Sequence, residues 1–329
     1  MSGKLSVTFS PHIQDRLSLS SMTWHTFAAL GPAILAGFYF YGLRAMVVVA
    51  LAVLSAMLTE AAMQRIMGRP ITIKDGTAAL TGLLLAMLLP VGVPWWTVII
   101  GAAVAIVLGK QLFGGLGGNP FNAVLVGWVV LRLSWPAAVG QFYETTPLFQ
   151  GWGALYALDS SELPLGLLKF GDSGTVMEMY DFWPVLLGGI PGGIGSTSVL
   201  GLIIGGLFLV ARRIVPWRIP AGFLGGMFLF GLICWLCDSQ GELYANPIHH
   251  IIFGYALIGA FFLAPDSATS PYTGSGALLF GLGAGVLTMI IRYWGSYQDG
   301  VVFAILFLNA LTPVLDRIHF RSYGRVQAA

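Results

Sequence analysis

The chain has 329 residues, of which 57% are hydrophobic and only 9% are charged, and its net charge is +2 at pH 7. An ordinary soluble domain carries roughly 25% charged residues, so this composition excludes a water-soluble fold of the usual kind. The mean hydropathy of +0.82 and the long apolar runs indicate helices in a lipid bilayer. The cationic side chains are scattered singly, which argues against a nucleic-acid partner.

Ten apolar segments are long enough to cross the hydrocarbon core, for which about 20 residues are needed. In chain order they are 23–41, 45–65, 76–93, 95–113, 121–139, 198–216, 219–237, 247–264, 276–292 and 300–316. They predict an all-α integral membrane protein that forms a single domain over residues 1–329. Residues 1–139 hold five helices, 140–197 form one long loop, and 198–329 hold five more.

Two halves with an odd number of helices are expected to be related by inverted topology. A weak internal repeat supports this. A segment ending near Lys110 leads through glycines to Asn119-Pro-Phe-Asn122, and a segment ending at Arg292 leads through a glycine to Asp299.

Lys and Arg residues in the connections orient the predicted helices. With the N-terminus inside, twelve lie on the inner side and four on the outer side, as the positive-inside rule requires. The inner ones are Lys4, Arg16, Arg65, Arg69, Lys74, Lys110, Arg212, Arg213, Arg218, Arg317, Arg321 and Arg325, and the outer ones are Arg44, Arg132, Lys169 and Arg292. We therefore expect a multi-pass protein of the bacterial inner membrane with both termini cytoplasmic.

The long loop 140–197 is then extracytoplasmic. It holds six acidic residues against one lysine, which are Glu144, Asp159, Glu162, Asp172, Glu178 and Asp181. It is also rich in aromatic residues, and loops of more than 12 to 15 residues are usually functional or disordered. We expect this loop to be folded.

The end of this loop, Gly192-Gly-Ile-Gly-Ser-Thr-Ser198, is the first candidate site. Hydroxyl groups at a helix start cap its N–H groups and lie at the positive end of the helix dipole, a geometry that favours a phosphate. A plain N-cap after a glycine turn explains the same pattern. The residues alone leave both interpretations open.

The inner connection 114–122, with the sequence Gly-Gly-Leu-Gly-Gly-Asn-Pro-Phe-Asn, is the second candidate site. Glycines let a planar ring approach the backbone, and an Asn amide offers both a donor and an acceptor. A flexible helix connection with an Asn cap is the alternative interpretation.

Four acidic or basic residues near predicted helices need an interpretation of their own. Glu60 is one turn from Gln64 and Arg65 and is expected to pair near the inner interface, and Arg132 is expected to extend to the outer interface. Asp75 and Asp266 stand at helix breaks, where they either cap helices or contact a ligand.

Taken together, the motifs resemble those of the D subunit of Rnf-type ion-translocating electron-transfer complexes. They are also similar to those of the B subunit of the sodium-pumping NADH:quinone oxidoreductase. The resemblance extends to residues 81–96, 264–271, 299–303 and 309–310, and so to nearly the whole chain.

The resemblance implies two flavins. Thr197 would carry FMN through a phosphoester, with Gly195, Ser196 and Ser198 beside it; Ser196 stands where those families commonly have Ala or Glu. A non-covalent riboflavin would lie at Asn119 and Asn122, with Gly115 and Gly117 in the same loop.

The function implied by the resemblance is that of a membrane subunit of a ferredoxin:NAD oxidoreductase coupled to Na⁺ or H⁺ movement. Because the chain has only Cys234 and Cys237 and no Gly-x-Gly-x-x-Gly opening, other subunits would bind NAD, hold iron–sulfur clusters and carry a second FMN. We expect no metal and no catalytic residue here, and no activity of the chain alone.

Two alternatives remain at this point. The first is the B subunit of the NADH:quinone oxidoreductase, which usually has a longer region before its first helix than residues 1–22 provide. The second is a secondary transporter or channel, because inverted halves and broken helices are common in that class.

Overall fold

The computed structural model describes residues 18–146, 156–158, 160–170, 182–238 and 244–318, and this part of the chain is mostly helical. Three helices are long and apolar enough to cross a membrane: α1 (Leu19–Ile66), α10 (Arg218–Cys237) and α13 (Gly274–Trp294). Five shorter apolar helices accompany them, namely α2 (Thr77–Leu88), α3 (Trp95–Ile106) with its π-helical extension Val107–Gln111, α4 (Ala123–Ser134), α9 (Val199–Ala211) and α14 (Val301–Leu315). The composition and these helices together define a membrane protein.

Helix α1 is two helices joined at a sharp kink. Its 48 residues would extend about 72 Å at 1.5 Å per residue, more than twice the hydrocarbon thickness. Gly42 breaks it with φ of 61° and ψ of −143°, a left-handed backbone that glycine adopts without steric cost. The two parts match the expected segments 23–41 and 45–65.

Helical structure lies in each of the ten expected segments, but segment 247–264 is not one helix. It consists of α11 (Pro247–Ile252), α12 (Ala256–Ile258) and a π-helical turn, Gly259–Leu263. The break falls at Phe253 and Gly254, where Gly254 has a φ of 77°. The expectation of a continuous helix here is wrong because hydropathy does not register a break between apolar residues. Ten membrane crossings remain a prediction.

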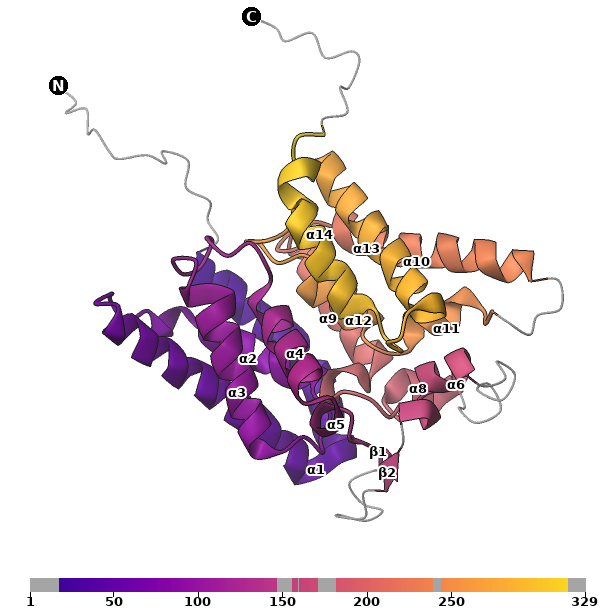
Figure 1. Cartoon of the computed structure of the whole chain (residues 1–329), viewed down its shortest axis with the longest axis horizontal. Helices are drawn as coiled ribbons and strands as arrows, with labels where there is room; N and C mark the ends of the chain where they lie inside the picture. Colours follow the sequence, from indigo (N-terminus) through magenta and orange to yellow (C-terminus); the bar gives the residue numbers. More distant parts are fainter. Residues whose placement is uncertain (1–17, 147–155, 159, 171–181, 239–243, 319–329) are drawn as a thin grey trace, which may run out of the picture.

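The first helix of each half packs against the other. A Cβ on Gly201 would lie 2.9 Å from the backbone of Ala33, and one on Gly205 would overlap the carbonyl oxygen of Ala29. Small residues four apart allow this close contact of helices, as is common in membranes. In Figure 1 the chain before the loop lies on one side of the molecule and the chain after it on the other.

A second close helix pair is formed by α10 and α13 within the second half. Gly222 and Gly226 of α10 face Gly281 and Gly285 of α13, and a Cβ at any of the four would meet backbone atoms of the opposite helix. The two backbones therefore touch along two turns.

The described parts of the long loop are folded, as expected. They form β1 (Phe142–Tyr143), which pairs antiparallel with β2 (Ala157–Leu158), the 3₁₀ turn Ser160–Glu162, α6 (Pro164–Phe170) and α8 (Phe182–Leu187), and the short helix α5 (Pro136–Val139) immediately precedes the loop. These elements lie at the edge opposite the start of α1 and the end of α14 (Figure 1). Several residues used in the predictions lie outside the described part of the chain: Lys4, Arg16, Asp159, Asp172, Glu178, Asp181, Arg321 and Arg325.

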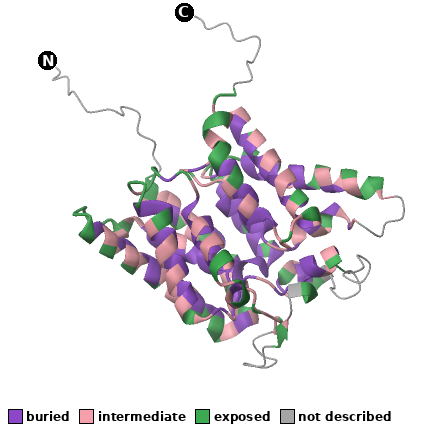
Figure 2. Ribbon diagram, in the orientation of Figure 1, coloured by how far each residue is buried: buried purple, intermediate pink, exposed green. Residues whose placement is uncertain are grey.

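Burial follows the pattern expected in lipid. Buried residues line the helix contacts, and exposed ones lie on the outer sides of the helices (Figure 2). Many of the exposed side chains are large and apolar, including Leu35, Leu58 and Leu236, each about two-thirds exposed. An apolar exterior of this extent needs a lipid or protein covering.

Candidate functional site

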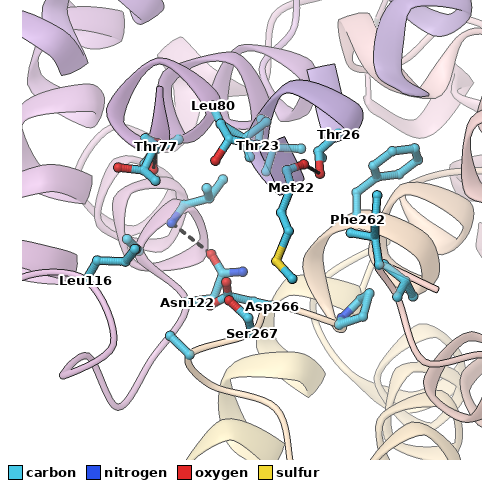
Figure 3. Close-up of a pocket in the computed structure, with 18 of the residues that line it drawn as sticks. Met22, Thr23, Thr26, Thr77, Leu80, Leu116, Asn122, Phe262, Asp266 and Ser267 are labelled. Carbon is cyan, nitrogen blue, oxygen red and sulfur yellow. Dashed lines mark hydrogen bonds between the residues drawn. The ribbon is translucent and has the colours of Figure 1, made fainter. Parts of the chain in front are cut away.

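The inner candidate site is a cavity of about 150 Å³ between the two halves. Its walls come from the start of α1, the start of α2, the connection before α4, the end of α9 and the segment after the π-helical turn Gly259–Leu263. Figure 3 shows Met22 extending between Leu80 on one wall and Asn122 and Asp266 on the other. Both predicted amides, Asn119 and Asn122, line this cavity.

Asn122 is held by three hydrogen bonds and organises the wall. Its Oδ1 accepts a hydrogen bond from Val124 N at 2.9 Å and caps α4, while its Nδ2 donates to Leu263 O at 3.0 Å. Its backbone N–H donates to Asn309 Oδ1 at 3.2 Å. The side chain and the backbone N–H of Asn122 together tie α4 to two elements of the second half, and the predicted Asn cap lies at Asn122.

Asn119 is bound differently and has an acceptor to offer. Its Nδ2 donates to Phe121 O at 3.0 Å, but its buried Oδ1 has no partner among the described residues. An unpaired buried acceptor is costly, so such an atom on a cavity wall indicates a missing donor. The donor N–H of a planar heterocycle such as the flavin ring fits this position.

The glycines of the same connection lie away from the cavity. Gly115 and Gly117 have φ of 105° and 89°, values that L side chains rarely adopt, and Leu116 lines the cavity between them. Arg69 donates to Gly114 O at 2.7 Å and so holds the loop from the side. These glycines shape the turn and are not brought into contact with the predicted ligand position.

A buried ion pair stands beside the cavity. Lys110 Nζ is 2.7 Å from Glu60 Oε1 and donates to Thr77 Oγ1 at 2.7 Å. The side chains of Lys110 and Glu60 are 4% and 1% exposed. Of the two neighbours expected to pair with Glu60, Gln64 donates to its Oε1 at 3.4 Å, but the ionic partner is Lys110 and not Arg65, because the π-helical turn after α3 brings Lys110 inside the bundle. Because Lys110 is buried, it should not be counted among the interfacial Lys and Arg residues that orient the protein in the membrane.

The two aspartates at helix breaks have different surroundings. Asp75 Oδ1 accepts hydrogen bonds from both the N–H and the hydroxyl of Thr77, the first residue of α2, so Asp75 satisfies a free N–H at the start of this helix, whose N-cap position is Gly76. Asp266 lines the inner cavity, and its Oδ2 accepts from Thr269 Oγ1 at 3.0 Å. The capping interpretation therefore holds for Asp75, and Asp266 is placed where it can meet a ligand.

The outer candidate site is a cavity of about 70 Å³ whose wall includes Gly192, Gly193 and Ser196. Tyr255 and Trp128 face each other edge to face with ring centroids 6.2 Å apart, and both side chains donate to Leu88 O. Leu88 ends α2, so this carbonyl is one of the orphan acceptors of a helix terminus. The glycine turn thus packs where the broken segments of both halves meet.

The three hydroxyl residues before α9 are all buried and have separate roles. Ser198 Oγ accepts from Gly201 N at 3.1 Å and caps α9. Ser196 Oγ donates to Gly193 O at 3.0 Å, and Thr197 Oγ1 donates to Ile194 O at 3.1 Å. The helix cap is therefore Ser198, and the Thr197 hydroxyl takes no part in capping.

Thr197 itself has no exposed surface and does not line the outer cavity, whereas Ser196 does. Gly195 packs against Met87, where a Cβ would lie 2.6 Å from the Met87 Cβ. Esterification of Thr197 therefore requires its hydroxyl to leave the Ile194 carbonyl and the turn to open toward the cavity.

A second buried ion pair supports the outer cavity. Arg292 Nη2 is 3.1 Å from Asp299 Oδ1, and the guanidinium also donates to the carbonyl oxygens of His250 and Phe253. Asp299 Oδ2 in turn accepts from Tyr255 N at 2.6 Å. The charge pattern of the sequence puts Arg292 at the outer interface, but it is buried and fixes the break between α11 and α12.

Two other cationic residues lie near the outer cavity. Arg132 donates to Pro136 O at 3.3 Å and lines this cavity. Lys169 donates to the carbonyl oxygens of Gly295 and Tyr297, and burial lowers the pKa of its ammonium group.

Helix α4 connects the two cavities. Asn122 precedes its first residue at the inner cavity, and Arg132, ten residues later, lines the outer one. At 1.5 Å per residue this places the two walls about 15 Å apart along the helix. Trp128 lies between them on the same helix.

Sequence reasoning missed Lys110, Trp128 and Tyr255 as site residues. Lys110 carried a usable signal, because an ionisable residue at the end of an apolar segment is a candidate for function. Trp128 and Tyr255 carried none, since an aromatic residue in an apolar segment is ordinary. Cys234 and Cys237 are free thiols, and no group of three metal-ligating side chains gathers in the described ranges.

Fold and site define a polytopic helical membrane protein with two mainly apolar cavities, each carrying a few polar groups, toward the two ends of helix α4. The chain belongs to the NQR2, RnfD, RnfE family, whose model matches residues 6–324.

Curated relatives match along almost their whole length. The chain is 38% identical over 321 residues to the D subunit of the Na⁺-translocating ferredoxin:NAD⁺ oxidoreductase complex of Acetobacterium woodii, covering 97% of this chain and 95% of the relative. It is 36% identical over 317 residues to the proton-translocating counterpart of Clostridium ljungdahlii, covering 94% and 93%. It is also 36% identical over 334 residues to the D subunit of the ion-translocating oxidoreductase complex of Ectopseudomonas mendocina, covering 96% and 94%.

Proposed function

We propose that this chain is the flavin-carrying membrane subunit of an ion-translocating ferredoxin:NAD⁺ oxidoreductase, equivalent to the D subunits of its relatives. The observation that carries the proposal is the match to complex subunits of that name across 97% and 94% of the chain. In this role the chain passes electrons between FMN bound covalently to Thr197 and a non-covalent riboflavin at the inner cavity. Its partners are the subunits that bind NAD, hold iron–sulfur clusters and carry a second FMN.

The surroundings of Asn119 support a riboflavin at the inner cavity. Its unpaired Oδ1 offers an acceptor for a ring N–H, and Lys110 offers a donor on the same cavity. Apolar side chains, among them those of Leu80 and Phe262, line much of the remaining wall. A planar ring with a polar edge fits a wall that combines a few polar groups with apolar side chains elsewhere.

The different hydrogen-bond partners of the three hydroxyl groups support FMN on Thr197. Modification of Ser198 would remove the cap of α9, at a cost of about 0.5–2 kcal/mol. The Thr197 hydroxyl bonds only to a local carbonyl, and the glycine turn before it borders the outer cavity. A phosphoester at Thr197 leaves the helix cap intact.

When bound, the flavins supply the redox chemistry, and the chain supplies their position and surroundings. Asn119, Asn122 and Lys110 would orient the inner ring, while the turn 192–197, Tyr255 and Trp128 would enclose the outer one. With an inner-membrane topology and cytoplasmic termini, the outer site would lie on the extracytoplasmic face.

A fluorescence assay on the denatured chain tests the covalent link. The complex is purified, denatured and run on a gel, with Thr197→Ala and Ser196→Ala as paired variants. We expect flavin fluorescence on the wild-type band and on Ser196→Ala, and none on Thr197→Ala. A wild-type band without fluorescence, or a fluorescent Thr197→Ala band, would refute the proposed attachment.

Flavin counting tests the inner site. The double variant Asn119→Ala with Asn122→Ala is expected to contain one flavin per chain where the wild type contains two. Two flavins retained in the double variant would exclude this site. Ferredoxin-dependent reduction of NAD⁺ by the purified complex separates this proposal from a quinone-reducing complex, which would instead reduce quinone with NADH.

A further inference from the structure

Lys110 is a charged side chain on the wall of the inner cavity, a position that its place in the sequence does not reveal. It is 3% exposed, and it comes from the π-helical turn that follows α3. An ammonium group has three N–H donors. Glu60 and Thr77 receive two of them, and Lys110 also lines the cavity.

The counter-charge of Lys110 lies behind it, away from the cavity. Glu60 Oε1 accepts hydrogen bonds from Gln111 Nε2 at 3.0 Å and Gln64 Nε2 at 3.4 Å in addition to the Lys110 contact. Glu60 is not among the residues that line the cavity, whereas Lys110 is. A ligand in the cavity therefore meets the cation first and the anion second.

The opposite wall carries Asp266, whose carboxylate is partly satisfied by Thr269. The cavity wall is thus uneven, with the Lys110 ammonium group toward α3 and the Asp266 carboxyl group toward the segment before α13. Because Lys110 is 3% exposed, water screens its charge less than that of a surface lysine, and the charge acts more strongly on a ligand in the cavity.

We propose that Lys110 sets the reduction potential of the ligand in the inner cavity, with Glu60 as the anion that moderates its charge. The inference rests on the proposed function, because it needs a redox ring in that cavity. An oxidised isoalloxazine ring that takes up two electrons and one proton becomes a monoanion, and a nearby cation stabilises that product over the neutral reactant. Lys110 is here a positioning and tuning residue, since the ring performs the electron transfer.

Removing the cation and removing the anion should shift the reduction potential in opposite directions. Lys110→Met removes the cation and keeps the length of the side chain, so it lowers the potential. Glu60→Gln removes the anion and leaves Lys110 uncompensated, so it raises the potential. A tenfold change in the ratio of affinities for the reduced and oxidised rings corresponds to about 30 mV for a two-electron couple.

The experiment is a reductive titration of the purified complex with dithionite, followed by flavin absorbance in the presence of redox mediators. The control is Lys74→Met, which removes a lysine of the same inner region that is exposed, so water screens its charge. We expect its potential to equal that of the wild type. Where Lys110→Met fails to assemble, the double variant Lys110→Met with Glu60→Gln removes both charges together and is expected to titrate below the wild type.

The outcomes separate the two proposals. A wild-type complex that releases no flavin on denaturation contradicts the proposed inner site. A wild-type complex that releases one flavin per chain, but whose potential is unchanged in both Lys110→Met and Glu60→Gln, overturns the role of Lys110. A shift of the same sign in both variants overturns it too, because loss of structure and not of charge would then explain the shifts.

Discussion

Asn119 and Asn122 look equivalent in the sequence, yet the structure predicts different consequences for their removal. Asn122→Ala deletes the cap of α4 and leaves Leu263 O without its donor. A lost N-cap costs about 0.5–2 kcal/mol and an unpaired buried carbonyl about 1–3 kcal/mol. We expect a loss of about 3 kcal/mol in the free energy of unfolding.

Asn119→Ala removes one local hydrogen bond, to Phe121 O, which is worth about 0.5–1.5 kcal/mol. It also removes the unpaired Oδ1, whose burial was unfavourable, so the net loss is about 1 kcal/mol or less. Asn119→Ala is expected mainly to weaken binding of the ligand, because Asn119 Oδ1 has no protein donor among the described residues and is free to accept a hydrogen bond from the ligand.

The two substitutions are compared by thermal unfolding in detergent, followed by tryptophan fluorescence, together with the flavin released on denaturation. We expect Asn122→Ala to melt well below Asn119→Ala, and Asn119→Ala to lose releasable flavin while melting near the wild type. Equal melting temperatures for the two variants, or full flavin retention in Asn119→Ala, would refute this reasoning.

Two further predictions concern packing and charge. Gly226→Ala brings a Cβ to 2.6 Å from Leu282 O, whereas the Cβ of the neighbouring Gly225→Ala meets nothing within 4 Å. We expect Gly226→Ala to lower the free energy of unfolding by about 1–3 kcal/mol through overpacking, and Gly225→Ala to raise it by up to about 1 kcal/mol through helix propensity. Equal melting temperatures of the two variants in detergent would contradict the α10–α13 contact. Arg292→Met leaves Asp299 without its cation and should lower the free energy of unfolding by about 3–5 kcal/mol. The double variant Arg292→Met with Asp299→Asn should lower it less. A double variant that melts below Arg292→Met would show that the unpaired charge is not the cause.

Local patterns predicted much of this fold. Hydropathy located helical structure in all ten apolar segments, and the glycine at position 42 divides α1 where two segments were expected. The hydroxyl cluster 196–198 was recognised as a helix start, and Ser198 is the cap. These features depend on residues within a few positions of one another, which is the range that a sequence pattern covers.

Long-range contacts could not be predicted. The pairing of Glu60 with Lys110 joins α1 to the end of α3, and nothing in the spacing of 50 residues indicates it. Tyr255 reaches Leu88 O from the other half of the chain, and Gly254 permits the break that brings it there. Such contacts depend on how the broken segments of the two halves meet, so they emerge only from the packed structure.

The most direct test of the proposed arrangement is to count the covalent and the non-covalent flavins of one chain in the same sample. The purified complex is denatured, the chain is separated from released small molecules, and both fractions are analysed by mass spectrometry. We expect one riboflavin per chain in the released fraction and one FMN, less a water, on the peptide that contains Thr197. A chain of unmodified mass with no riboflavin released would contradict the proposed two-flavin arrangement.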